Sequence, residues 1–388
     1  MNDFLKRTWA QINLDHLREN VEIIRNRLHP STQMMGIVKA DAYGHGDAFV
    51  ARELQNMGLC WFGVSNLEEA LSLRRAGITG DILILGMTPV QHGKDLEAHN
   101  ITQAVFSPEY AQALNAAALE SGVQVNVHVK LDTGMGRIGF AAESCQEAVR
   151  ELQECRGLLP TGLFSHFSHA DCDGEEARAY TRLQIKRFDQ AAEVFKQAFP
   201  NLILHLQNSA GIMDYPELSY DLARPGIILY GIAPSNEMGT TLPLKPVMEL
   251  KSTVAMVKTV EKGTAISYSR TFVAEQPMRV ATIPIGYADG YPRLLSNKGE
   301  VLIHGRRARV LGNVCMDQMI VDVTGIPETR TGDIVTVFGR DGDGFLPVEE
   351  LAQGVGTIPY ETVCLIGKRV PRTYWKNGSI IGVYDSIA

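Results

Sequence analysis

The chain has 388 residues, a length that suits two domains better than one compact core. A composition of 45% hydrophobic and 21% charged residues is ordinary for a globular protein and excludes a disordered or low-complexity chain. The formal net charge of −7 excludes the strongly basic surface that a nucleic acid or an anionic membrane would attract. We therefore expect a globular protein that binds no nucleic acid and no membrane.

Up to about residue 230, short apolar runs alternate with amphipathic segments, the first of which predicts a helix over residues 15–28. Eight runs predict strands over residues 34–38, 61–64, 82–85, 103–106, 124–130, 161–164, 202–206 and 227–230. The segments between them predict helices over residues 47–57, 67–76, 90–98, 108–119, 143–155, 175–198 and from 210. This alternation predicts an α/β fold, the (β/α)₈ TIM barrel. The alternative is a doubly wound open sheet, which usually has fewer strands and a glycine-rich first turn that is not seen here.

After about residue 240 the pattern changes to alternating β-type runs separated by turns such as Asp341–Gly344. The runs cover residues 251–260, 278–285, 300–303, 308–311, 319–323 and 334–338. We therefore expect a barrel domain over residues 12–240 and a C-terminal β-rich domain over residues 241–388, which residues 1–11 join.

Two further features concern the cell compartment and metals. The first residues lack the apolar core of a secretory signal, and no apolar run reaches the roughly 20 residues of a spanning helix. The six cysteines include no Cys-x-x-Cys pair. We interpret none of them as a zinc ligand that pairs with a nearby histidine. We expect a cytoplasmic protein with free thiols and no metal site.

Reactive side chains of a barrel follow the carboxyl ends of its strands. Lys39 directly follows the apolar run 34–38 and precedes a glycine-rich loop that contains Tyr43 and His45. A lysine bordered by apolar residues can have a lowered pKa, and its neutral amine can form a Schiff base. Taken alone, Lys39 has an equally good alternative as a lysine that extends from a strand end to water.

Other predicted strand ends add polar groups on the same side of the barrel. They are residues 130–137, 165–171 and 207–209, and Arg224–Gly226 stands just before the eighth predicted strand. Barrels often bind phosphate with the loops after strands seven and eight and a helix N-terminus, and Ser209 with the N–H groups of Gly226 and Ile227 suits that task. His166 alone is more often a satisfied core histidine, but several polar strand ends together favour a site.

The segment Val38–Gly46, VKADAYGHG, resembles the cofactor-lysine motif of the alanine racemase family. The resemblance continues over essentially the whole chain, through residues 130–137, 208–209, 224–227, 266–268, 286–290, 315–318 and 359–361. It implies an isomerase that interconverts L-alanine and D-alanine with pyridoxal 5'-phosphate and supplies D-alanine for peptidoglycan. It also implies a homodimer whose active sites lie between one barrel and the partner's β domain.

The resemblance further implies a role for each site residue. Lys39 carries the cofactor as a Schiff base, and Tyr268 of the partner chain is the second catalytic base. His166 flanks the cofactor ring, Arg224 faces its pyridine nitrogen, and Arg137 and Met316 contact the substrate carboxylate or the phenolic oxygen of the cofactor. The remaining cofactor-binding residues, most of them at the phosphate, are Tyr43, Asn208, Ser209, Gly226, Ile227 and Tyr360.

These roles agree with the chemistry of racemisation, which removes a proton from one face of Cα and returns one on the other. Lys39 serves one face, and Tyr268 serves the other only if neighbouring cations lower its phenol pKa, for which Arg224 and His166 are the candidates. A guanidinium only donates, so an arginine at the pyridine nitrogen keeps that nitrogen unprotonated and makes the ring a poorer electron sink.

Three details of the resemblance concern access and charge. Asp171, Tyr287, Arg293 and Tyr360 resemble the gate that narrows the way to the site in this family. Asn313 stands where members often have an arginine before Val-Cys-Met-Asp. Lys130 matches a lysine that some members carry as a carbamate, and the alternative is an ordinary lysine paired with Asp132.

Three rival functions remain. A pyridoxal-phosphate decarboxylase would more often place a carboxylate where Arg224 stands and has a Gly-Gly phosphate loop that is missing here. A barrel that carries the cofactor without turnover would leave the residues after about 240 unexplained. The alternative within the family is a serine or broad-range amino-acid racemase.

Overall fold

The computed structural model describes residue 4 and residues 6–385, which divide into two compact units. Of the described residues, 17–42 and 47–245 form the barrel unit, and 4, 6–16, 43–46 and 246–385 form the β unit. Residues 1–3 and 5, which the sequence assigns to the β domain, lie outside the described residues, as do 386–388. Within the described part of the chain, no helix is long and apolar enough to cross a membrane.

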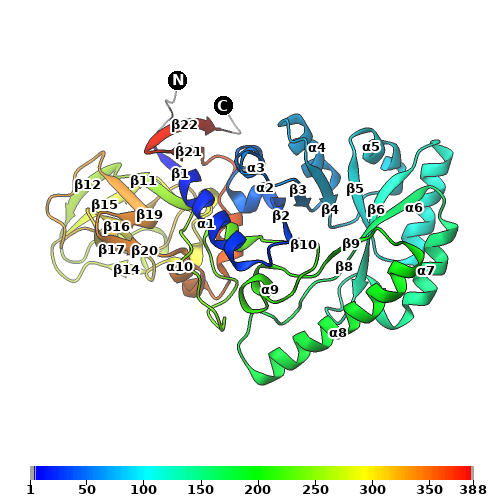
Figure 1. The fold of residues 1–388 in the computed structure, drawn as a ribbon. Coiled ribbons are helices and arrows are strands. Elements are labelled where there is room, and N and C mark those ends of the chain that lie inside the picture. Colours follow the sequence, from blue (N-terminus) through cyan, green and yellow to red (C-terminus); the bar gives the residue numbers. More distant parts are fainter. Residues whose placement is uncertain (1–3, 5, 386–388) are drawn as a thin grey trace. The chain divides into compact units, whose positions relative to one another are not determined.

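The predicted (β/α)₈ barrel with a β-rich second domain is confirmed. Among the described residues of the barrel unit, eight parallel strands close on themselves through the pairings of the first with the last and of β5 with β6. Helices flank the strands (Figure 1). In order around the barrel the strands are β2 (Gln33–Ile37), β3 (Trp61–Val64), β4 (Asp81–Ile84), β5 (Ile101–Val105), β6 (Val125–Asp132), β8 (Leu158–Phe164), β9 (Ile203–His205) and β10 (Leu222–Ala223).

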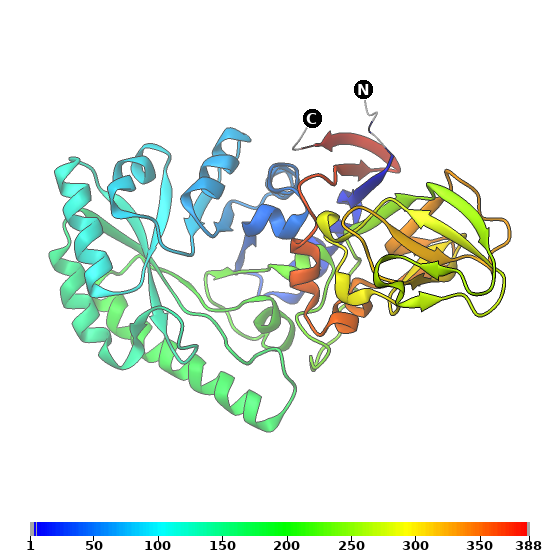
Figure 2. The same ribbon diagram turned by 180° about the vertical axis from the view of Figure 1, so that it is seen from behind.

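Two of the barrel helices begin at caps that the sequence predicts. The side chain of Asn66 accepts from the N–H of Glu69 at the start of α4, and Ser107 caps α6 in the same way through Tyr110. The long helix α8 runs along the barrel (Figure 2). The helices are α1 (Leu14–Arg27), α3 (Asp47–Asn56), α4 (Leu67–Arg75), α5 (Gly93–Ala98), α6 (Pro108–Glu120), α7 (Cys145–Glu154), α8 (Glu175–Ala198) and α9 (Ser209–Asp214).

The prediction of the eighth strand over residues 227–230 is wrong. Strand β10 is Leu222–Ala223, and residues 227–230 form the 3₁₀ helix η3 (Ile227–Tyr230). All four residues of η3 are buried, so its apolar run has the pattern of a buried strand, and periodicity cannot separate the two. Arg224 therefore follows the eighth strand rather than preceding it, and it stands at a strand end as Lys39 does.

The short helix α2 (Lys39–Gly44) begins at Lys39, and the residues that follow the lysine form a left-handed turn. Residues 40–43 have φ values between +53° and +55°, and Gly44 has φ +79°. Non-glycine residues rarely adopt this conformation, which costs roughly 1–2 kcal/mol per residue. Hydrogen bonds offset part of this cost: the N–H of Ala40 donates to Glu69 Oε1 at 2.8 Å, and Asp41 Oδ1 accepts from the N–H of Asp47 at 2.9 Å.

In the β unit, eleven strands of the described chain form one sheet, in which the N-terminal strand β1 lies between β11 and β21. The strands are β1 (Thr8–Asn13), β11 (Met248–Thr253), β12 (Met256–Val260), β15 (Met278–Ile283), β16 (Glu300–Ile303), β17 (Arg306–Leu311), β18 (Met319–Asp322), β19 (Ile334–Asp341), β20 (Gly344–Leu346), β21 (Arg372–Lys376) and β22 (Ser379–Tyr384). The short strands β13 (Ala265–Ile266) and β14 (Phe272–Val273) pair separately. The helical segments are η4 (Tyr268–Arg270), η5 (Tyr287–Asp289), η6 (Arg293–Leu295), α10 (Val348–Val355) and α11 (Pro359–Cys364).

Candidate active site

In the barrel unit, the predicted site residues stand at or just after the carboxyl ends of strands. Lys39 is half-buried and follows β2 after the single residue Val38. The other strands contribute Lys130 from β6, His166 after β8, Asn208 and Ser209 after β9, and Arg224 directly after β10. Because the strands are parallel, these residues lie at one end of the barrel, as predicted for a barrel enzyme.

Arg224 is buried, with 3% of its surface exposed, and is held by uncharged acceptors. Its Nη2 donates to the carbonyl oxygens of Ser165 at 2.6 Å and Leu206 at 3.0 Å. Its Nη1 lies 2.9 Å from His205 Nδ1, and Nη2 lies 3.2 Å from His166 Nδ1. Within residues 4 and 6–385, no carboxylate forms an ion pair with this guanidinium.

The contacts of Arg224 fix the tautomers of a chain of histidines. A guanidinium can only donate, so Nδ1 of His205 accepts and its Nε2 carries the proton. This Nε2 lies 2.8 Å from Nδ1 of His128, which then accepts and carries its own proton on Nε2. The His128 ring packs on Gly162, where an added Cβ would lie 2.5 Å from the ring, so only a glycine fits.

These histidines are neutral at neutral pH. Burial, together with the charge of Arg224, lowers the pKa of His128 to about 3 and holds the pKa values of His166 and His205 well below their usual range. Burial and then the Arg137 charge lower the pKa of Arg224 to about 9, so it remains a cation. The expectation that His166 adds positive charge beside Tyr268 is therefore wrong, and Arg224 is the cation of this cluster.

Lys130 is a second buried basic residue of the cluster. Its Nζ donates to the carbonyl oxygen of Leu131 at 2.8 Å and lies 5.4 Å from the Phe164 ring centre. Burial first, and then the Arg224 charge, lower the pKa of Lys130 to about 7. The Asp132 carboxylate accepts from the N–H groups of the turn at residues 134–136, with Oδ1 2.9 Å from the nitrogen of Gly134.

Two helix starts meet at the predicted phosphate site. Asn208 caps α9 by accepting from the N–H of Gly211 at 2.9 Å, and this places Ser209 at the first position of the helix. The Ser209 hydroxyl oxygen accepts from the N–H of Gly226 at 2.9 Å, directly before η3 and Ile227. The serine hydroxyl keeps its own proton for donation, so this region offers donors to an anion.

In the β unit, Tyr268 and the segment of Met316 are brought together by Asn313. The Asn313 side chain donates from Nδ2 to the carbonyl oxygen of Tyr268 at 2.8 Å, and its own carbonyl oxygen accepts from the Ser267 hydroxyl. Cys315 Sγ lies 3.5 Å from the Ser267 hydroxyl oxygen. Tyr268 is 68% exposed and Met316 is 52% exposed, so the β unit alone leaves both side chains uncovered.

Asp289 anchors the neighbouring loop of the β unit. It is fully buried, and its carboxylate accepts from Arg7 at 2.5 Å and from Arg369 at 2.9 Å. It also caps η5 by accepting from the N–H of Gly286 at 2.9 Å. The N–H of Ala288 in this helix donates to the carbonyl oxygen of Met316 at 3.0 Å, so Asp289 positions both the Tyr287 helix and the Met316 segment.

The remaining predicted site residues have less definite surroundings. Tyr43 and Tyr360, both in the β unit, have ring centres 6.2 Å apart, and burial raises the pKa of the Tyr43 hydroxyl. Arg137 is exposed on the loop after β6, where its charge still lowers the pKa of Arg224. Of the residues that resemble a gate, Tyr287 and Arg293 are exposed and Asp171 is half-buried.

Sequence reasoning missed His128, His205 and the positioning role of Asp289. His128 stands in the strand sequence VNVHVKLD among buried apolar residues, and a polar side chain in such a run is a signal that could have identified it. Asp289 belongs to a motif that the sequence singled out, but its two arginine partners lie far from it in the chain.

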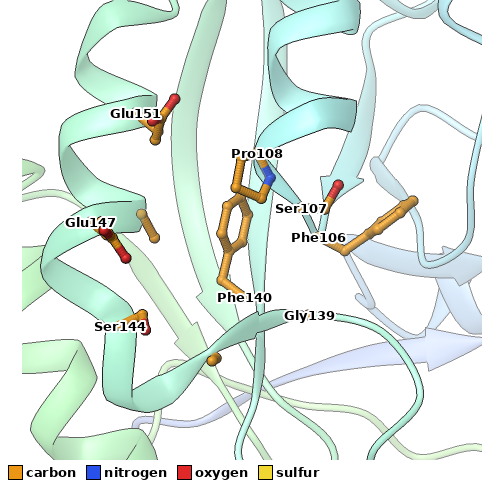
Figure 3. A pocket seen from close by; sticks show the side chains of 10 residues that line it. Phe106, Ser107, Pro108, Gly139, Phe140, Ser144, Glu147 and Glu151 are labelled. Carbon is orange, nitrogen blue, oxygen red and sulfur yellow. The ribbon is translucent and has the colours of Figure 1, made fainter.

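A cavity of about 250 Å³ lies elsewhere on the barrel unit, between α6 and α7 (Figure 3). Phe106, Pro108 and Phe140 line it, with Glu147 and Glu151 on α7. It contains none of the predicted site residues, so it is separate from the cluster at the strand ends.

Comparison with known protein families gives two matches that together cover most of the chain. Residues 12–234 match the family described as alanine racemase, N-terminal domain. Residues 247–374 match the alanine racemase C-terminal domain.

Similar proteins span nearly the full length. An alanine racemase of Desulfovibrio desulfuricans is 44% identical over 375 residues, which are 96% of this chain and 100% of the relative. Alanine racemase 1 of Clostridium acetobutylicum is 42% identical over 387 residues, which are 99% of each chain.

Solved structures of alanine racemases are also similar to this chain over nearly its full length. The alanine racemase of Clostridium difficile 630 has a TM-score of 0.93 at 39% identity and covers 100% of each chain. A Bacillus anthracis alanine racemase with bound L-Ala-P has a TM-score of 0.92 at 33% identity over 99% of each chain. A Bartonella henselae alanine racemase with covalently bound pyridoxal phosphate has a TM-score of 0.84 at 28% identity over 95% of this chain and 99% of that chain.

Proposed function

The chain belongs to the alanine racemase family and is an amino-acid isomerase, and we propose that it interconverts L-alanine and D-alanine with pyridoxal 5'-phosphate as cofactor. The observation that carries the cofactor proposal is the buried guanidinium of Arg224, which has uncharged acceptors around it and no carboxylate partner among the described residues. Such a donor suits a ring nitrogen that must accept a hydrogen bond. A structure of the Bartonella henselae relative carries covalently bound pyridoxal phosphate.

The donor set fits each part of this cofactor. We assign Lys39 to its covalent attachment, Arg224 to the pyridine nitrogen and His166 to the face of the ring. Phosphate is an anion, and the meeting helix starts with the Ser209 hydroxyl offer it donors. We assign the phosphate to the set Tyr43, Ser209, Gly226, Ile227 and Tyr360, and Asn208 to cofactor binding as the cap of α9.

When bound, pyridoxal phosphate supplies the electron-withdrawing ring that makes the Cα hydrogen of an amino acid removable. Lys39 Nζ takes or returns the proton on one face of Cα, and Tyr268 Oη acts on the other face. The Arg224 guanidinium can only donate a hydrogen bond, so the ring nitrogen that faces it would have to accept and stay unprotonated. An unprotonated ring nitrogen limits side reactions such as transamination. Arg137 and Met316 hold the substrate carboxylate or the phenolic oxygen.

We propose a homodimer in which Tyr268 and Met316 act in the partner's site. The exposure of Tyr268 at 68% and Met316 at 52% supports this assignment, because a catalytic phenol needs a site that excludes water. The β unit exposes further large apolar side chains, Leu294 at 67%, Ile358 at 56% and Leu365 at 52%. Apolar exposure on this scale is typical of a surface that another chain covers.

Three finer assignments complete the proposal. We place the domain boundary at about residue 240, with the cofactor on the barrel domain. We place the protein in the cytoplasm, because its six cysteines, all within the described residues, are free. Its product serves peptidoglycan synthesis, and a serine or broad-range racemase is the alternative to an alanine enzyme.

The test incubates the cofactor-loaded protein with pure L-alanine in D₂O and follows D-alanine and deuterium at Cα together. We expect D-alanine that carries deuterium at Cα, since the returned proton comes from groups that exchange with solvent. L-serine serves as the matched substrate control and should turn over far more slowly. Release of carbon dioxide, or no D-alanine from a protein that retains its cofactor, would overturn the proposal.

A further inference from the structure

A group of metal-ligating side chains lies in the loop that leads from β8 to α8. His169, Asp171 and Cys172 each offer one ligand atom, and these atoms lie within 4.8 Å of one another. A fourth group comes from a segment 65 residues away in the chain, because the Glu237 carboxylate accepts a hydrogen bond from the Cys172 thiol, with Sγ 3.0 Å from Oε2. The sequence led us to expect no metal site, because that expectation did not take account of His169, three residues before Cys172.

Main-chain contacts hold the two segments of this cluster together. The N–H of Asp173 donates to the carbonyl oxygen of Glu237 at 2.7 Å, and the Ser235 hydroxyl donates to the carbonyl oxygen of Asp171. Ala170, between the ligating residues, is buried at 3% exposure. The fold therefore brings the two backbone segments together before any ion binds, which lowers the cost of assembling a site.

The donor atoms suit one metal better than others. An imidazole nitrogen, a sulfur and carboxylate oxygens are ligands of zinc, whereas calcium and magnesium take oxygen ligands. Zinc bonds of about 2.0–2.3 Å put the donor atoms of a tetrahedron roughly 3.3–3.8 Å apart. The ligand atoms of His169, Asp171 and Cys172 lie up to 4.8 Å apart, which is about 1 Å beyond this range, whereas Cys172 Sγ and Glu237 Oε2 lie 3.0 Å apart. Rotations of these side chains are therefore needed to bring all four donors to zinc distances.

We propose that His169, Asp171, Cys172 and Glu237 bind one zinc ion through nitrogen, oxygen, sulfur and oxygen. On binding, the S–H proton of Cys172 is released to solvent, and the thiolate forms the bond to zinc. The ion ties the loop that begins at His166 to the segment after η3. Zinc should therefore raise the thermal stability of the protein, since it binds only the folded arrangement.

The test titrates zinc into the full-length, cofactor-loaded protein after treatment with a chelator, by calorimetry. We expect one bound zinc per chain, a raised unfolding temperature and protection of one thiol from a thiol reagent. Cys172→Ser and His169→Ala should each weaken binding at least tenfold, because even residues that only support a metal ligand cost about 10–100-fold. Glu237→Gln should weaken binding by about tenfold for the same reason.

The matched control is Cys60→Ser, which removes an exposed thiol of the same unit outside the cluster. It should leave zinc affinity, thiol protection and the temperature shift as they are in the parent protein. Absence of zinc binding by the parent protein, equal affinity in Cys172→Ser, or equal loss in Cys60→Ser would each overturn the proposal. If Cys172→Ser does not fold, the affinity of His169→Ala decides in its place.

Discussion

At the scale of single residues, the surroundings of Arg224 decide the protonation of its neighbours. The guanidinium is buried among carbonyl oxygens and imidazoles rather than beside a carboxylate. A buried cation without a counter-ion disfavours any further positive charge nearby, and burial acts in the same direction on a histidine. His128, His166 and His205 are therefore kept neutral, so that among Arg224 and these three histidines only the arginine is charged.

We predict that acid weakens the fold through these histidines. Below about pH 6.5 the unfolded chain takes up protons at them and the folded chain does not, so the free energy of unfolding falls as the pH falls. Each histidine contributes about 1.4 kcal/mol per pH unit, and for His128 this continues down to its folded pKa of about 3. Urea unfolding at a series of pH values measures the slope of the free energy of unfolding against pH.

The variants for this measurement are His128→Phe and His29→Gln. The first removes one buried histidine and should reduce the slope by about 1.4 kcal/mol per pH unit. The second removes an exposed histidine and should leave the slope unchanged. An unchanged slope in His128→Phe would show that His128 takes up its proton in the folded state.

Lys130 is a second residue whose chemistry follows from burial. With a pKa of about 7, roughly half of its amine is neutral at pH 7, and a neutral amine can add carbon dioxide as a carbamate. We predict a carbamate signal in ¹³C NMR spectra of the protein in labelled bicarbonate. Lys130→Arg keeps the positive charge but cannot form the carbamate and should lack the signal. No signal in the parent protein would leave Lys130 an ordinary buried lysine.

Asn313 gives a prediction for the second base. Its donation to the carbonyl oxygen of Tyr268 fixes the backbone of η4, so Asn313→Ala should misplace the phenol. We expect turnover to fall on the order of tenfold, because a misplacement of 1 Å can cost about 10²-fold. Cofactor absorbance and the apparent affinity for alanine should change little. A fall in cofactor content that accounts for the lost activity would contradict a positioning role.

At the scale of elements, the left-handed turn behind Lys39 stores strain at the site. Four successive non-glycine residues hold φ near +53°, which only a glycine adopts without cost. Lys39 itself lies outside this strained run, so the turn changes the direction of the chain immediately after the lysine. A strained backbone of this kind persists where surrounding contacts hold it in place. Here the Glu69 carboxylate accepts a hydrogen bond from the N–H of Ala40, and the Asp41 carboxylate accepts one from the N–H of Asp47.

The strain predicts that one alanine-to-glycine change stabilises the protein. Ala40 is exposed with φ +53°, so Ala40→Gly should raise the free energy of unfolding by up to about 1 kcal/mol. The same change at Ala116, exposed in the middle of α6, should lower it by about 1 kcal/mol. Chemical denaturation compares the two. Equal destabilisation by both changes would mean that the turn carries no relievable strain.

The sequence predicted the barrel because eight apolar runs alternate with capped amphipathic segments, and the alternation survives errors in single elements. It misplaced the eighth strand because the buried η3 is as apolar as a strand. It identified Lys39 at a strand end from its position along the chain, but it placed Arg224 before the eighth strand, whereas Arg224 follows that strand. It could not predict the neutrality of His166 or the partners of Asp289, because both depend on residues that only the fold brings close.

At the scale of the whole molecule, the proposed sharing of sites across a dimer gives a mixing experiment. Lys39→Ala and Tyr268→Phe chains should each be inactive alone. Random exchange makes half of the dimers mixed, and in a mixed dimer one of the two sites has both Lys39 and the partner's Tyr268. We therefore expect about a quarter of the parent activity after exchange. No recovery, with mixed dimers shown to form, would place Tyr268 in the site of its own chain.

The position of β1 in the sheet of the β unit has a consequence for synthesis on the ribosome. This strand is among the first residues made, yet its neighbours β11 and β21 follow more than two hundred residues later. Because the ribosome adds about 5–20 residues per second, the backbone N–H and C=O groups of β1 remain unpaired for roughly ten seconds or longer before a partner strand is made. Such a strand resembles an open edge that can pair with a neighbouring nascent chain. The barrel can close while β1 waits, so translation speed and chaperone supply, rather than equilibrium stability, should govern the yield of correctly assembled protein.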